Sequence, residues 1–375
     1  MPNGPMSDTA TRPPGPIELP DIAARSEAVR RAVDALRRGG AVALGEGPAR
    51  LAVAAVEVLS QPTLDALRAS DAGAVVLAMT SPRAGALGME AADRPHVAHL
   101  RPAASLDEIR ALAQPQGVDL RPLLAGEDDA SADPAIAAAL QLAKLAGLMP
   151  MILFARDVAG RIDLPALSAA GILTFAEDSA RWLTRVAETR LPLADAEDAR
   201  LVAFRPWDGG AEALAIVIGT PDTASPVPVR IHSSCFTGDL IGSLRCDCGD
   251  QLRGAIRAIA DLGAGVVVYL PQEGRGIGLV NKIRAYALQD AGFDTIDANT
   301  HLGFEPDERG YAAAGEILRR LGISRIRLLT NNPGKRAALA GLGVEVVDRL
   351  PLVIAPNPHN EAYLRTKKLR DGHGF

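Results

Sequence analysis

The spacing of apolar and polar positions alternates between helical and strand-like periods from residue 21 onward. In the first half, Ser26 is a candidate N-cap for a helix that carries Val29, Val33 and Leu36 on one face. Short apolar runs without this period indicate buried strands. The strands predicted here are 41–44, 74–80 and 150–155, and the further helices are 51–59, 62–69, 134–147 and 177–189.

A polar segment at 190–200, which contains Pro192, precedes a second run of alternating elements. The strands predicted in this run are 214–219, 227–233, 264–270, 326–330 and 344–347, and the helices are 249–262, 279–292 and one ending at Leu321. The pattern therefore predicts an α/β (mixed α+β) protein of two domains. The predicted divisions are a flexible Pro- and Gly-rich tail (1–20), a first domain (21–194) and a second domain (195–375).

Composition agrees with an ordinary folded protein. The chain has 375 residues, enough for two domains, with 48% hydrophobic and 23% charged residues. A net charge of −5 argues against a dedicated nucleic-acid binder. No apolar run is long enough to span a bilayer and no signal peptide is evident, so we expect a cytoplasmic protein that binds neither membrane nor nucleic acid.

All three cysteines lie in one short stretch, RIHSSCFTGDLIGSLRCDCGDQ (230–251), in the pattern C-x10-C-x-C. Three thiolates on Gly-containing backbone can bind one cation, and soft sulfur ligands favour zinc. The alternative is three unrelated buried cysteines, but none lies elsewhere in the chain. A structural site would need a fourth protein ligand, for which His232 is the candidate; an open fourth position would instead indicate catalytic zinc.

Two strand-to-helix junctions offer sites for anions. The loop QEGRGIG (272–278) follows a predicted buried strand and precedes a helix, which is the setting of a phosphate or nucleotide site. A dinucleotide-binding loop is the rival interpretation, but Leu279 replaces the third glycine of G-x-G-x-x-G and Glu273 and Arg275 add charge. Lys335 stands in the first turn after the strand 326–330, where it is either a phosphate ligand or a solvated lysine.

The stretch 230–367 closely resembles GTP cyclohydrolase II, the enzyme that opens riboflavin biosynthesis. The matching segments occur in the family's order with similar spacing: HSSCFTGDLIGSLRCDCGDQL, QEGRGIGLVNKIRAYALQD, LGFEPDER, RLLTNNPGKR and NPHNEAYLRTK. The resemblance implies a zinc-dependent enzyme that hydrolyses GTP, opens the imidazole ring of guanine, and releases formate and pyrophosphate to leave a diamino-ribosylamino-pyrimidinone phosphate. It also implies a homodimer, with one zinc per chain and Mg²⁺ on the triphosphate.

The resemblance assigns roles to individual residues. Cys235, Cys246 and Cys248 would hold the zinc that activates water for attack at C8 of guanine. Arg309 would attack the α-phosphorus, with Asp307 as its general base. Tyr286 matches a tyrosine near the reacting base and would be the third catalytic residue. The residues that match positions contacting GTP are Arg230, Ile231, His232, Ser233, Ser234, Gln251, Glu273, Gly274, Arg275, Thr295, Thr330 and Lys335.

Two positions depart from the family. Ser234 stands where a glutamate usually precedes the first cysteine, and Pro271 stands where a basic residue is common. Two alternatives therefore stay open beside GTP hydrolysis: a related purine-nucleotide cyclohydrolase with an altered substrate or product, and a non-catalytic nucleotide-binding regulator.

The first domain resembles dihydroxybutanone-phosphate synthase, which is fused ahead of the cyclohydrolase in many bacteria. The similar segments are AVDALRRGGAVAL and SDAGAVVLAMT. The acidic metal loop of that synthase is missing, because the corresponding stretch GEGPARLAVA contains only Glu46. We therefore expect a folded but non-catalytic domain, and a fragment starting near Asp195 that keeps the zinc site and the chemistry.

Overall fold

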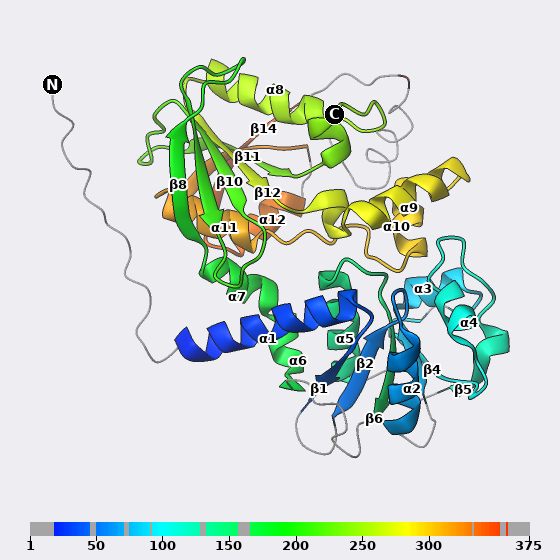
Figure 1. Cartoon of the computed structure of the whole chain (residues 1–375). Helices are drawn as coiled ribbons and strands as arrows, with labels where there is room; N and C mark the ends of the chain where they lie inside the picture. Colours follow the sequence, from blue (N-terminus) through cyan, green and yellow to red (C-terminus); the bar gives the residue numbers. More distant parts are fainter. Residues whose placement is uncertain are drawn as a thin grey trace.

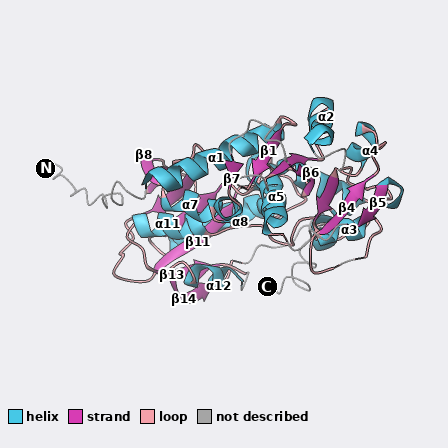
Figure 2. Cartoon of the chain, turned by 90° about the horizontal axis from the view of Figure 1, so that it is seen from below, coloured by secondary structure: helices cyan, strands magenta, loops and turns pink. Residues whose placement is uncertain are grey.

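The computed structural model describes residues 19–45, 50–70, 75–90, 92–127, 133–156, 166–331, 334–352 and 358. Most of the predicted tail, Glu46, and all but Pro358 of the segment 357–367 lie outside these residues. Two seven-stranded sheets organise the chain, each with helices packed against it (Figures 1 and 2). This is the mixed α/β architecture expected from the sequence. No helix in the described ranges combines the length and apolar character needed to cross a membrane.

The first sheet is mostly antiparallel; only β1 and β7 run parallel. Its order is β5 (Leu124–Glu127), β4 (His96–Leu100), β3 (Val76–Met79), β6 (Met151–Arg156), β2 (Leu51–Ala55), β1 (Ala41–Leu44) and β7 (Ala166–Leu167). The helices of this half are α1 (Leu19–Arg37), α2 (Gln61–Ser70), α3 (Ser81–Ala86), α4 (Leu106–Ala111), α5 (Pro134–Leu145), α6 (Ala169–Leu173), α7 (Phe175–Arg181) and the turn η2 (Arg121–Leu123).

The second sheet joins a parallel half to an antiparallel half. Its order is β14 (Glu345–Leu350), β13 (Arg325–Leu329), β11 (Val227–Ser233), β12 (Gly265–Leu270), β10 (Ala213–Ile218), β9 (Ala199–Arg205) and β8 (Thr184–Arg190). The first four strands run parallel, and β10, β9 and β8 are antiparallel. The helical elements are η4 (Phe236–Leu240), α8 (Cys248–Asp261), η5 (Glu273–Gly276), α9 (Leu279–Asp290), α10 (Thr295–His301), α11 (Ala312–Arg320) and α12 (Gly334–Ala340).

Three predictions about local structure are wrong. Residues 51–55 form a strand, not a helix: all five are buried, and β2 pairs with β1 and β6. A short apolar run fits either element, and sheet pairing decides between them. Helix α1 begins at Leu19, so Ser26 is a buried residue within the helix and not its cap.

The helix predicted over 177–189 is also wrong in its second part. Helix α7 ends at Arg181, and β8 pairs antiparallel with β9. Every β8 side chain is exposed, so this edge strand has no apolar alternation that would reveal it in the sequence. The second sheet therefore begins at Thr184, and the predicted hinge at 190–200 is the connection between β8 and β9.

The two halves share one hydrophobic cluster. Helices α9 and α10 lie beside the second sheet and next to the first half (Figure 1). Ile277, Leu288 and Phe304, each at most 2% exposed, pack in the same cluster as Leu77 and Met79 of β3. The structure thus argues against the expected independence of a fragment starting near residue 195, because that fragment would expose these side chains and lack β8.

Candidate active site

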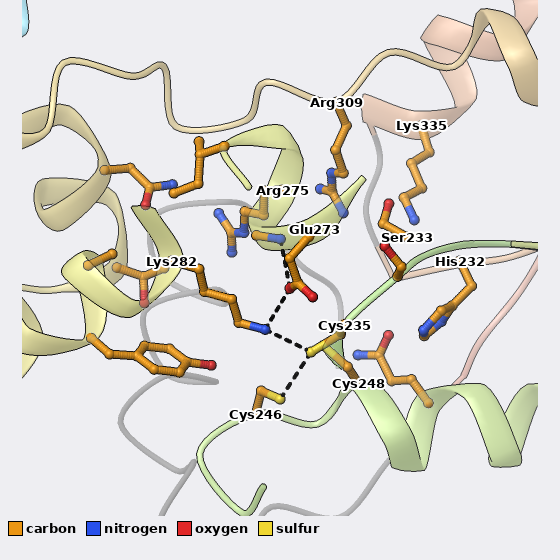
Figure 3. Close-up of a pocket in the computed structure, with 18 of the residues that line it drawn as sticks. His232, Ser233, Cys235, Cys246, Cys248, Glu273, Arg275, Lys282, Arg309 and Lys335 are labelled. Carbon is orange, nitrogen blue, oxygen red and sulfur yellow. Dashed lines mark hydrogen bonds and ion pairs between the residues drawn. The ribbon is translucent and has the colours of Figure 1, made fainter. Parts of the chain in front are cut away.

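Parallel strands of the second sheet deliver the site residues. Strands β11, β12 and β13 lie side by side and end at Ser233, Leu270 and Leu329. The chain then continues into the cysteine motif, the Gly-rich turn η5 and Thr330, respectively. The carboxyl ends of adjacent parallel strands meet at one edge, where α/β proteins commonly bind ligands. One pocket opens at this edge (Figure 3).

The three cysteines meet at the floor of this pocket. Cys235 follows β11, Cys246 lies in the loop after η4, and Cys248 begins α8. Their Sγ atoms all lie within 4.8 Å of one another, and those of Cys235 and Cys246 are 3.7 Å apart. A tetrahedral zinc with Zn–S bonds of about 2.3 Å separates its sulfur ligands by about 3.8 Å. The donor set and its spacing therefore fit zinc.

Two glycines permit this close approach. A Cβ at Gly238 would lie 2.8 Å from Cys246 Sγ, and a Cβ at Gly249 would lie 2.3 Å from the Gly238 carbonyl oxygen. Any side chain at either position would push η4 away from α8. The glycines of the motif thus set the distance between the first cysteine and the other two.

His232 does not join the cysteines. Its Nε2 lies 3.1 Å from Asp239 Oδ2, and Tyr269 donates a hydrogen bond to the same oxygen at 3.0 Å. Burial lowers the pKa of His232, against the opposing effect of Asp239. In the described residues, the metal-ligand cluster at this site contains Cys235, Cys246 and Cys248 alone, which leaves a fourth position open.

Lys282 of α9 connects the cysteines to the Gly-rich turn. Its Nζ donates to Cys235 Sγ at 3.0 Å and to Glu273 Oε1 at 2.8 Å (Figure 3). It also donates to Thr237 Oγ1 at 2.8 Å. Burial acts to lower the pKa of Lys282, but its bonds to Cys235 and Glu273 outweigh this and raise the pKa. Hydrogen bonds from the other two thiols, followed by that from Lys282, lower the pKa of Cys235. A buried cation therefore favours the thiolate that a metal requires.

The Gly-rich turn has an unusual backbone. Arg275 has φ 61°, in the left-handed region that non-glycine residues rarely adopt, and Gly274 precedes it with φ 64°. A Cβ at Gly276 would lie 2.8 Å from the Glu308 carbonyl oxygen. Arg275 donates from Nη1 to the Pro306 carbonyl oxygen at 3.3 Å. The turn is therefore packed directly against the segment that carries Asp307 and Arg309.

Asp307 and Arg309 form a two-pronged ion pair. Arg309 Nε donates to Asp307 Oδ1 at 2.7 Å, and Nη2 donates to Oδ2. Burial acts to raise the pKa of Asp307, but the hydrogen bonds and charge of Arg309 outweigh this and lower it. Arg309 lines the pocket with its side chain 14% exposed, whereas Asp307 does not line it and has a side chain 36% exposed.

The other side of the pocket is basic. Arg230 donates to the Leu329 carbonyl oxygen at 3.0 Å and to Gln251 Oε1, and burial lowers its pKa to about 10. Lys335 donates to the Ile231 carbonyl oxygen at 3.1 Å. These buried cations give this wall a positive potential suited to phosphates.

The structure brings nearly all of the predicted site residues to one pocket. Those that line it are Arg230, His232, Ser233, Ser234, Cys235, Cys246, Cys248, Gln251, Glu273, Gly274, Arg275, Tyr286, Thr295, Arg309, Thr330 and Lys335. Ile231 is 1% exposed and contributes its backbone oxygen to Lys335, and Asp307 reaches the pocket through Arg309.

Sequence reasoning missed other lining residues, including Lys282, Gln289 and Asn299. Each looks like an ordinary polar residue of a helix or loop, and the fold alone brings it to the site. Four buried atoms of lining residues have no hydrogen-bond partner in the described structure: Arg230 Nε, His232 Nδ1, Ser233 Oγ and Asn299 Nδ2. Buried polar atoms are normally paired, so this pocket has room for a polar ligand that would pair them.

Comparison with known proteins agrees with this arrangement. The model of the family GTP cyclohydrolase II matches residues 184–351. GTP cyclohydrolase-2 of Azospirillum brasilense is 47% identical over 383 aligned positions, covering 98% of each chain. This chain belongs to the GTP cyclohydrolase II family. The family match begins at the first residue of β8, as does the second sheet.

Two further relatives belong to the same family or to riboflavin biosynthesis. GTP cyclohydrolase-2 of Xylella fastidiosa is 41% identical and covers 92% of this chain and 86% of its own. The riboflavin biosynthesis protein RibBA of Parabacteroides distasonis is 42% identical and covers 63% of this chain and 62% of its own.

A solved two-domain 3,4-dihydroxy-2-butanone 4-phosphate synthase, RibBX from A. baumannii, aligns over 88% of this chain and 100% of its own at 15% identity. Its TM-score of 0.34 is too low to relate the folds.

Proposed function

We propose that this protein hydrolyses GTP, opening the imidazole ring of guanine with release of formate and pyrophosphate. Two hydrolytic steps at C8 expel formate, and displacement at the α-phosphorus expels pyrophosphate. The product is a diamino-ribosylamino-pyrimidinone phosphate, which would begin riboflavin synthesis. The observation that carries the proposal is the placing of the cysteine cluster and Arg309 on one pocket.

Cys235, Cys246 and Cys248 would hold one zinc ion, which supplies Lewis-acid activation of water near neutral pH. Lys282 offsets part of the negative charge that three thiolates create, because its ammonium lies 3.0 Å from Cys235 Sγ. The purine ring would lie over this floor, next to Tyr286, whose ring has the Arg245 guanidinium carbon 4.6 Å from its centroid.

Arg309 would act at the α-phosphorus, with Asp307 accepting its proton. The carboxylate is 2.7 Å from Nε and also accepts from Nη2, so it contacts the guanidinium proton that must leave. Guanidinium is ordinarily protonated, and the lowered pKa of Asp307 makes this transfer uphill. The step therefore depends on neighbouring cations that stabilise the phosphate charge as pyrophosphate departs, a role that suits Arg275 and Lys335.

Base recognition would involve Glu273. Its Oε2 accepts from the Phe236 backbone N–H at 2.6 Å, and its Oε1 accepts from Lys282 and from the Gly274 backbone N–H. Oε1 already accepts two hydrogen bonds, whereas Oε2 accepts one and has a second lone pair that can accept from N1 or N2 of guanine. Ser234 lines the same pocket in place of the family's glutamate, which makes Glu273 the carboxylate on which recognition depends.

The remaining parts of the proposal are magnesium, dimerisation and compartment. Mg²⁺ would be held mainly by the triphosphate oxygens, since the described ligand cluster is composed of cysteines and Mg²⁺ prefers oxygen. Three free cysteines suit a reducing cytoplasm. A homodimer is supported by exposed apolar residues on η4, on the loop that follows it and on α9: Phe236, Leu240, Ile241, Leu244, Val280 and Ile283. The Lys282–Thr237 hydrogen bond joins η4 to α9.

The test is to incubate the full-length protein with GTP, Zn²⁺ and Mg²⁺ and to measure formate and pyrophosphate separately. We expect both products in equal amounts. Release of pyrophosphate without formate would indicate a different nucleotide hydrolase, and tight GTP binding with neither product would indicate a regulator.

A further inference from the structure

One ion pair connects the first half of the chain to the segment that carries Asp307 and Arg309. Lys144, in the last turn of α5, places Nζ 2.6 Å from Glu308 Oε1. Glu308 stands between Asp307 and Arg309 in the sequence. Both members of the pair have side chains only 15% exposed, so water screens their attraction far less than it would at the surface.

Glu308 is fixed from several sides. Its Oε1 also accepts from the Glu305 backbone N–H at 2.8 Å, and its own N–H donates to the Arg275 carbonyl oxygen at 3.1 Å. The Glu308 side chain therefore points to the first half, while its backbone lies against the Gly-rich turn. Because Glu308 is fixed in this way, the positions of its sequence neighbours Asp307 and Arg309 are restricted as well.

The surrounding segment needs such support. Residues 302–311 form neither helix nor strand, so no regular hydrogen-bond ladder holds their backbone. The first half also holds the entry to this segment: Thr80 Oγ1 donates to the Gly303 carbonyl oxygen at 2.7 Å, and Arg83 Nη1 donates to that of His301 at 2.8 Å. From the second half, Gln272 Nε2 donates to the Gly310 carbonyl oxygen at 2.5 Å.

A second set of contacts fixes α9 on the other side of the pocket. Arg284 Nη2 lies 2.7 Å from Glu57 Oε1 of the first half, and Asn281 Nδ2 donates to the Gly147 carbonyl oxygen at 2.9 Å. Between these two anchors on α9 lies Lys282, which binds Cys235 and Glu273. The segment 302–311 and α9, on the two sides of the pocket, are thus both held by contacts with the first half of the chain.

We propose that Lys144 is a positioning residue for the reaction, which holds Asp307 and Arg309 in place through Glu308. The inference rests on the proposed function for its kinetic readout. A displacement of about 1 Å at a reacting group can reduce the rate by roughly a hundredfold. Loss of the Lys144 charge leaves the largely buried Glu308 carboxylate without a counter-charge, so the 302–311 segment shifts and Arg309 loses its alignment.

The experiment compares full-length Lys144→Met, Lys144→Arg and Glu308→Gln with the exchanged pair Lys144→Glu/Glu308→Lys. We expect kcat for pyrophosphate release to fall about 10- to 100-fold in Lys144→Met and Glu308→Gln. KM for GTP and zinc content stay near wild type, because neither residue lines the pocket. Lys144→Arg and the exchanged pair recover most of the rate. Arg31→Met is the matched control, since it removes a first-half cation from an exposed pair with Glu27.

Hydrogen exchange supplies a readout that does not depend on activity. In Lys144→Met, amides of residues 302–311 should exchange faster than in wild type, while those of α8 are unchanged. Wild-type kcat, or unchanged exchange in this segment, in a correctly folded Lys144→Met protein would overturn the proposal. A wild-type protein without GTP hydrolysis would refute the proposed function, whereas the exchange measurement would still decide whether Lys144 positions the segment.

Discussion

The Lys282 ammonium lies 3.0 Å from the Cys235 sulfur, which places a buried positive charge beside the proposed metal. Lys282→Met should reduce formate release and zinc affinity by about 10- to 100-fold, the usual effect of losing a group that supports a metal ligand. Lys282→Arg should retain more of both, because it keeps the charge. Assays of formate and bound zinc on the same samples check this, and wild-type zinc affinity in Lys282→Met would contradict it.

Cys246→Ser should abolish zinc binding and formate release, since a hydroxyl is a poor substitute for thiolate. The protein should still fold, because the two large cores of the second half are built from residues other than Cys246. Metal analysis and circular dichroism separate these effects. A zinc-free variant that releases formate at the wild-type rate would disprove the metal assignment.

Arg309→Ala should reduce pyrophosphate release by roughly 10³-fold or more, as expected for loss of a nucleophile. Nucleotide binding should survive through Arg230 and Lys335. The matched control is Arg121→Ala, because Arg121 makes the same pair with Asp119, two residues earlier, on an exposed surface. Pyrophosphate release at the control's rate in Arg309→Ala would remove Arg309 from the chemistry.

Asp307→Asn should change the acid stability of the protein. The pKa of Asp307 is lower in the folded state, so its contribution is fully present above the unfolded pKa of about 3.9. That contribution is lost as pH falls through the folded pKa. Urea unfolding should therefore show wild type more stable than Asp307→Asn from pH 5 to 8, with the difference shrinking below about pH 4. A difference that grows at low pH would contradict the ion pair.

The full-length protein should release no formate from ribulose 5-phosphate and Mg²⁺ in the absence of GTP. The expectation rests on the sequence, where Glu46 is the sole carboxylate of the stretch GEGPARLAVA. One carboxylate holds Mg²⁺ weakly and leaves no neighbour to act as base. Formate from ribulose 5-phosphate would show that the first domain is catalytic.

The sequence predicted the site better than it predicted the structure around it. The cysteine spacing and the strands at 227–233, 264–270 and 326–330 are local signals, and the structure has all of them. The strand at 51–55 was misread because its helical or extended state depends on distant strands. Lys282 and Lys144 were missed because their partners lie 47 and 164 residues away, and no short-range pattern encodes such contacts.

Arg83 is fully buried, and its guanidinium donates to carbonyl oxygens of Leu112 and Gln114 in the first half and of His301 in the second. A gene fission that separated the two halves would remove the His301 carbonyl oxygen from this buried cation and would expose the hydrophobic cluster that both halves share. Selection can therefore retain the first half without any reaction of its own. First-half residues that contact the second half, such as Arg83 and Lys144, should change only together with their partners, while the remaining surface of the first half is under no such constraint.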